Sequence, residues 1–106
     1  MRLSAEHRVG ITVGDETFVS ILRKPTNKEL NDFLGERFEV GRKGKMKDHS
    51  LQARVDFYDL LLIGVENLEG SDGQPITPEG KDQIPPNWKA AVVFKEFEDI
   101  EIDEKN

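Results

Sequence analysis

Residues 51–68 form the longest apolar stretch of the chain and dominate its hydrophobic pattern. One set of apolar residues recurs at alternating spacings of four and three, which is the spacing of one helical face: Leu51, Val55, Tyr58, Leu62 and Val65. A second set widens this apolar stripe: Phe57, Leu60, Leu61 and Leu68. We therefore predict a central helix over residues 50–68 that other elements cover on more than one side.

Strict alternation of apolar and small residues marks the N-terminal part of the chain. Val9, Ile11 and Val13 alternate with other residues as in a strand with one buried face, and a turn-forming Gly14-Asp15-Glu16 follows. Residues 17–23 are then apolar enough to be the returning strand. We predict a β-hairpin over residues 8–23, which needs helices or another subunit for support because an isolated hairpin is marginally stable in water.

A capping box predicts the start of the first helix. The Thr26 hydroxyl is placed to accept from the amide of Glu29, and the Glu29 carboxylate to accept from the amide of Thr26. Apolar residues then follow at the offsets of one helical face: Leu30, Phe33, Leu34 and Phe38. We predict a short amphipathic helix over about residues 26–39 that stops before Gly41.

Glycine and proline are frequent between residues 69 and 87, where the pattern predicts a long loop without regular structure. The sequence from Asn67 does not match the pattern of a calcium-binding loop. Such loops need glycine at the sixth position and glutamate at the twelfth, but here glycine occupies the seventh position and Pro78 the twelfth. Asn87 can cap a third helix over residues 87–98, although residues 91–94 also suit a buried strand. Residues 99–106 form an acidic tail, which we expect to be flexible.

These elements predict an α+β fold in one compact domain, residues 1–98. A β-hairpin precedes a small bundle of about three helices, and the long Gly/Pro-rich loop precedes the last of them. The length of 106 residues suits a single core. The hydrophobic fraction of 36% is low and the charged fraction of 34% is high, so we expect that core to be small.

The net charge of -6 opposes non-specific binding to nucleic acid or to an anionic membrane. The absence of cysteine excludes disulfides, thiolate metal sites and cysteine nucleophiles. Nowhere do about eighteen uncharged apolar residues occur together, as a membrane span requires. We expect a soluble, cytoplasmic protein without a cofactor.

A basic, glycine-interrupted segment opposes this average charge. It contains four cations: Arg42, Lys43, Lys45 and Lys47. Such a cluster is a candidate contact for an anion or for nucleic acid. A segment with four cations and no aromatic residue between them is more often a solvent-exposed connecting loop.

No constellation of side chains nominates a catalytic site. The two histidines, His7 and His49, lack a second ligand at metal spacing. Asp56 and Asp59 lie three residues apart on the predicted central helix and are the best candidates for an acid/base pair. Acids on helices usually face water or pair with a cation, here Arg54, so we expect no enzymatic activity.

Protein binding is the remaining class of function. The apolar stripe of the predicted central helix is wider than two short helices and a hairpin can cover. Tryptophan, in addition, is enriched in binding hot spots. The candidate partner-binding residues are Leu61, Leu62, Val65, Leu68, Trp88, Phe94 and Phe97. Core packing is the alternative for each aromatic residue among them.

Three stretches resemble the small tail assembly chaperones of long-tailed bacteriophages and prophages. The first is residues 18–34, with Leu-Arg-Lys-Pro-Thr-Asn-Lys-Glu-Leu. The second is residues 53–80, where Leu-Leu-Ile-Gly-Val-Glu-Asn-Leu leads into Asp-Gly-Gln-Pro-Ile-Thr. The third is Ile84-Pro-Pro-Asn-Trp-Lys.

This resemblance implies a non-enzymatic factor in the host cytoplasm. Such a protein binds the tape measure protein, keeps it soluble and helps to recruit tail tube subunits, and members of the family often self-associate. The alternative is a small nucleic-acid-associated or regulatory module that uses residues 42–47.

Overall fold

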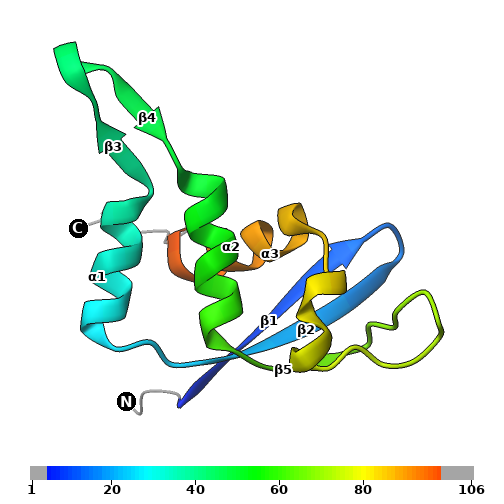
Figure 1. The fold of residues 1–106 in the computed structure, drawn as a ribbon. Coiled ribbons are helices and arrows are strands. Elements are labelled where there is room, and N and C mark those ends of the chain that lie inside the picture. Colours follow the sequence, from blue (N-terminus) through cyan, green and yellow to red (C-terminus); the bar gives the residue numbers. More distant parts are fainter. Residues whose placement is uncertain (1–4, 99–106) are drawn as a thin grey trace, which may run out of the picture.

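The computed structural model describes residues 5–98, so the predicted acidic tail lies outside the described residues. It contains a three-stranded antiparallel sheet, three α-helices and a projecting two-stranded hairpin (Figure 1). The strands are β1 (Glu6–Val13), β2 (Glu16–Arg23), β3 (Phe38–Val40), β4 (Met46–Asp48) and β5 (Leu62–Glu66), and the helices are α1 (Asn27–Glu36), α2 (Ser50–Leu61) and α3 (Pro86–Val93). The predicted α+β class is confirmed.

The N-terminal hairpin is confirmed. β1 and β2 pair in register from Glu6 opposite Arg23 to Val13 opposite Glu16, and Gly14 turns the chain with a φ of 64°. Such a positive φ suits glycine, which has no Cβ to clash. β5 adds a third strand beside β2, so the sheet order is β1-β2-β5.

The predicted central helix over residues 50–68 is wrong beyond Leu61. Leu62 leaves the helical conformation with φ -65° and ψ 125°, and residues 62–66 become β5. The strand is favoured because Leu62 and Val65 find partners opposite Leu22 and Ser20 of β2. β5 thereby supplies support that the hairpin alone would lack.

α1 begins as predicted. The Glu29 amide donates to the Thr26 hydroxyl at 3.1 Å, and the Thr26 amide donates to the Glu29 carboxylate at 2.9 Å. The helix ends at Glu36, earlier than the predicted residue 39. Phe38 therefore lies in a strand, not on the helical face with Phe33.

The predicted basic loop is the tip of a second hairpin, residues 38–48, which we call the arm. Phe38 pairs with Asp48 and Val40 with Met46. A short 3-10 turn, η1 (Arg42–Gly44), joins the strands, with Lys43 and Gly44 both at positive φ. The arm rises from the ends of α1 and α2 and points away from the sheet (Figure 1).

The Gly/Pro-rich segment contains one short regular element, η2 (Pro78–Gln83), a 3-10 helix that the breaker pattern did not predict. The helical interpretation of the next segment is confirmed: α3 begins at Pro86 and continues into a π-turn, η3 (Phe94–Glu98). Proline suits the first helical turn because its missing N–H is not needed there.

One core joins the sheet to the helices. Its buried apolar residues come from both sheet and helices, and α2 contacts both α1 and α3. Tyr58 is fully buried, and its hydroxyl lies 3.0 Å from the equally buried Ser20 hydroxyl of β2. This bond satisfies two polar groups that would be costly to bury alone.

Candidate protein-binding surfaces

A groove at one end of the sheet brings together two of the predicted partner-binding residues, Leu68 and Trp88. The larger of its two adjoining hollows measures about 320 Å³ and is lined by Leu68, Glu69, Gly70, Ser71, Ile76, Gln83, Pro85 and Trp88. The smaller measures about 90 Å³ and is lined by Val13, Glu16, Phe18, Asn67, Leu68 and Trp88. We call the two together the Trp88 groove.

Trp88 is fixed in this groove by packing against the sheet. Its ring centroid lies 5.6 Å from that of Phe18 on β2, and the two rings are tilted by 32°. The isolated bridge between Glu69 and Pro75 and the bond from the Ile76 amide to the Leu68 carbonyl, 2.9 Å, hold the opposite wall. The Gly/Pro-rich segment is thus a wall of the groove.

The other predicted partner-binding residues divide by exposure. Leu61, Leu62 and Phe97 are buried in the core, where they contribute packing and offer no accessible surface in this structure. Val65 is partly buried. Phe94 is 46% exposed, and the Arg54 guanidinium carbon lies 5.1 Å from the centre of its ring.

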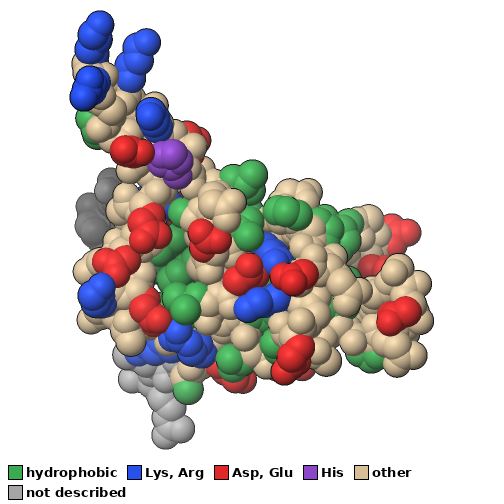
Figure 2. Space-filling model, viewed as in Figure 1, with side chains coloured by type: hydrophobic (Ala, Val, Ile, Leu, Met, Phe, Trp, Pro, Cys, Tyr) green, Lys and Arg blue, Asp and Glu red, His purple; other side chains and the backbone are tan. Residues whose placement is uncertain are grey.

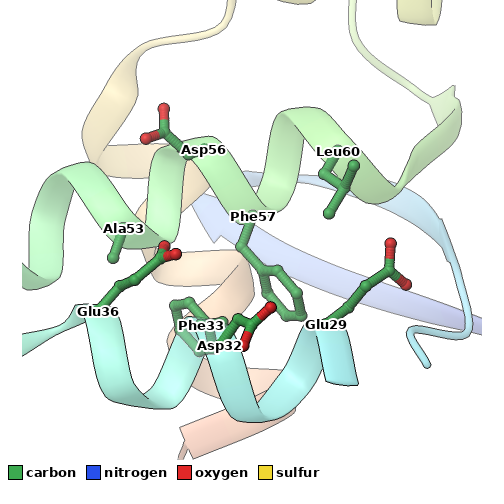
Figure 3. A pocket seen from close by; sticks show the side chains of 8 residues that line it. All are labelled: Glu29, Asp32, Phe33, Glu36, Ala53, Asp56, Phe57 and Leu60. Atoms are coloured by element: carbon green, nitrogen blue, oxygen red, sulfur yellow. The ribbon is translucent and has the colours of Figure 1, made fainter. Parts of the chain in front are cut away.

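A second surface, which the sequence did not predict, is a cleft between α1 and α2 (Figure 3). It measures about 190 Å³ and is lined by Glu29, Asp32, Phe33, Glu36, Ala53, Asp56, Phe57 and Leu60. The rings of Phe33 and Phe57 stack at 4.3 Å with an interplanar angle of 2°, and Leu60 is 52% exposed. We call this apolar, acid-rimmed hollow the α1/α2 cleft.

The four carboxylates of the α1/α2 cleft differ in how far they are neutralised. Glu29 accepts two hydrogen bonds from Arg23, at 2.9 and 2.7 Å, and Asp32 pairs with Lys28 at 2.7 Å. Among the described residues, neither Glu36 nor Asp56 forms an ion pair. Within the described residues, the end of the cleft nearest the arm therefore carries the two acids that form no ion pair.

The four predicted cations, Arg42, Lys43, Lys45 and Lys47, lie on the arm. Figure 2 shows lysine and arginine side chains gathered at its far end, away from the acids on the body. None of the four pairs with an acid in the part of the chain described by the structure.

The arm also exposes apolar side chains: Val40 and Met46, which pair with each other below the tip, are 72% and 66% exposed. Alternation of Phe38 and Val40 before a glycine-rich turn was a signal for this strand.

Asp56 and Asp59 do not form a pair of interacting acids. Asp56 is exposed and accepts from the Gln52 amide at 2.8 Å, whereas Asp59 accepts from the Lys89 ammonium at 2.8 Å. His7 and His49 lie apart, beside Glu96 and Glu39 respectively. Within residues 5–98 no cluster of three or more side chains is suited to hold a metal ion.

The described residues include no helix with the length and apolar character that crossing a bilayer requires. No family model, curated protein or solved structure matches the chain.

Proposed function

We propose that this chain is a tail assembly chaperone-like protein of a long-tailed phage or prophage. It binds the tape measure protein, assists assembly of the tail tube and performs no catalysis. This role is suggested by the resemblance to tail assembly chaperones in residues 18–34, 53–80 and 84–89. The Trp88 groove supports the protein-binding part of it, because it gathers apolar side chains from distant segments at an accessible surface.

The Trp88 groove suits an apolar side chain from a client. Leu68 and Trp88 offer the apolar surface, with the buried Ile76 behind them, while the backbone of residues 69–71 and the Gln83 amide supply polar groups along the wall. A helical client would place residues spaced by three and four into such a groove. The acidic character of the chain favours solubility of the complex, since a net charge far from zero opposes non-specific aggregation.

Trp88 is the only tryptophan and therefore reports directly on this groove by fluorescence. The experiment titrates the protein with overlapping peptides tiled along the tape measure protein of the same genome. We expect one segment to shift the Trp88 emission, and Leu68→Asp to weaken its binding at least about tenfold. Leu51→Asp is the matched control, because Leu51 is 55% exposed and does not line the groove.

If none of the peptides shifts the emission and co-expression does not increase the amount of soluble tape measure protein, the proposal is wrong. Equal loss of binding in Leu51→Asp and Leu68→Asp would place the client elsewhere.

The cationic arm favours the alternative, a nucleic-acid-associated or regulatory module. A hairpin with four cations that form no ion pair within residues 5–98 is able to follow a phosphate backbone, although the net charge of -6 opposes it. Binding to duplex DNA or to RNA that falls steeply with salt and is lost on replacing Arg42 and Lys45 by Ala would support this alternative over the chaperone.

A further inference from the structure

The arm and the α1/α2 cleft are complementary in charge and in polarity. We propose that the arm of one copy of this chain lies in the α1/α2 cleft of a second copy. This self-association uses a surface separate from the Trp88 groove, so it can be tested independently of client binding.

The arm has an apolar side that nothing in the described chain covers fully. Phe38 and Val40 are two residues apart and so lie on one face, and Met46 is paired directly with Val40. Phe38 is 43% exposed, and the other two are more exposed still. A two-stranded hairpin with such a face is marginal in water, so covering the face by another chain stabilises it.

The α1/α2 cleft offers the matching surface. Leu60 supplies most of its accessible apolar surface, because the Phe33–Phe57 stack beneath is only 2% and 4% exposed, and its rim is acidic on both helices. Figure 3 shows Glu36 on α1 and Asp56 on α2 at the same end of the cleft. These two acids have no ion pair among the described residues, just as the cations of the arm have none.

The lengths of the two features agree. The extended part of the arm, residues 38–41, spans about 13 Å at about 3.3 Å per residue. The ten residues of α1 span about 15 Å at about 1.5 Å per residue. The extended part of the arm is therefore similar in length to the helix that forms one side of the cleft.

The arm is unable to reach its own cleft, because it continues outward from the ends of α1 and α2 (Figure 1). A second copy is the occupant that supplies both the apolar face and the cations. Two copies that exchange arms about a two-fold axis bury both arms and both clefts in one closed dimer.

Charge reversal on each side tests the proposal. The arm variant is Lys45→Glu with Lys47→Glu, and the cleft variant is Glu36→Lys with Asp56→Lys. We expect sedimentation velocity to show the unaltered chain associating, and each variant alone dissociating at least about tenfold more readily. An equimolar mixture of the two variants restores association, because each reversed arm then meets a reversed cleft.

Control variants each reverse a single charge of the same sign elsewhere. Lys24→Glu and Asp82→Lys alter exposed residues outside the arm and outside the lining of the cleft, and we expect both to associate as the unaltered chain does. Circular dichroism of each variant reports whether the fold is intact. Val40→Ser with Met46→Ser provides a second arm variant without charge reversal, and we expect it to dissociate too.

Several results would overturn the proposal. One is that the unaltered chain remains monomeric at concentrations up to about 1 mM. Another is that the mixture of folded arm and cleft variants fails to associate. A third is that the arm variant loses binding to DNA but still self-associates, which would assign the arm to nucleic acid. A fourth is that removing residues 99–106 abolishes association but the cleft substitutions do not, which would assign the acidic tail as the occupant that binds the arm.

Discussion

Arg54 of α2 and Glu98 at the end of η3 form a two-point ion pair. Arg54 Nε lies 2.6 Å from Glu98 Oε2, and its second donor lies 3.0 Å from Oε1. Arg37, just after α1, adds a bond of 2.8 Å to the same carboxylate. The Glu98 side chain is only 4% exposed, so this carboxylate ties the π-turn to both helices that form the α1/α2 cleft.

We predict that Glu98→Gln lowers the free energy of unfolding by about 2 kcal/mol, the scale of a hydrogen bond to a charged group. Burial alone would raise the pKa of Glu98, but the hydrogen bonds from Arg54 and Arg37 outweigh it and the pKa is lowered. The stabilisation is therefore present above the pKa of the unfolded chain and is lost as the pH falls through that of the folded chain. Urea unfolding at neutral pH measures the loss.

Glu69→Gln is the matched control for Glu98→Gln, because Glu69 is exposed and we expect its replacement to leave the unfolding midpoint nearly unchanged. Equal midpoints for the Glu98→Gln variant and the unaltered protein would contradict the structural role of this carboxylate.

Tyr58 is the only tyrosine, so its ionisation is readable by ultraviolet absorbance. Burial, more than any other cause, raises the pKa of Tyr58 above its ordinary value of 10.0. The native state favours the protonated phenol, so its contribution to stability is present below about pH 10 and declines as the pH rises through the folded pKa. We predict that tyrosinate absorbance appears only together with alkaline unfolding seen by circular dichroism. Tyrosinate in a chain that keeps its native spectrum at pH 10 would contradict the prediction.

Lys89 is a buried cation whose ammonium donates to Asp59 at 2.8 Å and lies 5.8 Å from the centre of the Tyr58 ring. We predict that Asp59→Ala costs about 3 kcal/mol, because it leaves a buried charge without its partner. Lys89→Met should cost less, since it leaves the partly exposed Asp59 free to be hydrated. Thermal unfolding of both variants and of the double variant checks this order. A larger loss in Lys89→Met than in Asp59→Ala would reverse the interpretation.

Local signals in the sequence predicted the parts of the fold that local contacts decide. The capping box at Thr26 and the alternation around Val9 are decided within a few residues, and both predictions are confirmed. The stretch around Leu62 is different, because its apolar spacing fits a helix equally well. Pairing with β2, which is distant in sequence, makes it a strand.

The candidate sites were predictable to a lesser degree. Leu68 and Trp88 were identified separately from their apolar character, but only the folded chain places them in one groove. Phe33 and Phe57 were predicted as core residues of two helices, and nothing in their spacing shows that the helices leave a cleft above them. Clefts depend on how elements pack, whereas sequence periodicity reports only which face of an element is buried.

Glu29 links the end of β2 to the start of α1, and its charge should give the fold a characteristic acid sensitivity. The hydrogen bonds from Arg23, followed by that from the Thr26 amide, lower the pKa of Glu29 from 4.5 to about 2. Because the folded pKa is the lower one, the stabilisation is fully present above about pH 4.5 and disappears as the pH falls towards about 2. We predict that Glu29→Gln is less stable than the unaltered chain at pH 7 and that the two curves converge across this window.

Thr26→Ala provides the comparison that separates charge from capping. It removes the hydroxyl that accepts from the Glu29 amide and should cost about 1 kcal/mol. It leaves the Arg23–Glu29 pair and the Thr26 amide in place, so its cost should change little between pH 7 and pH 3. Urea unfolding of the three proteins across this pH range tests both statements. Curves for Glu29→Gln and the unaltered chain that stay parallel down to the acid limit would show that the Glu29 charge contributes nothing, because only an ionisable partner produces convergence.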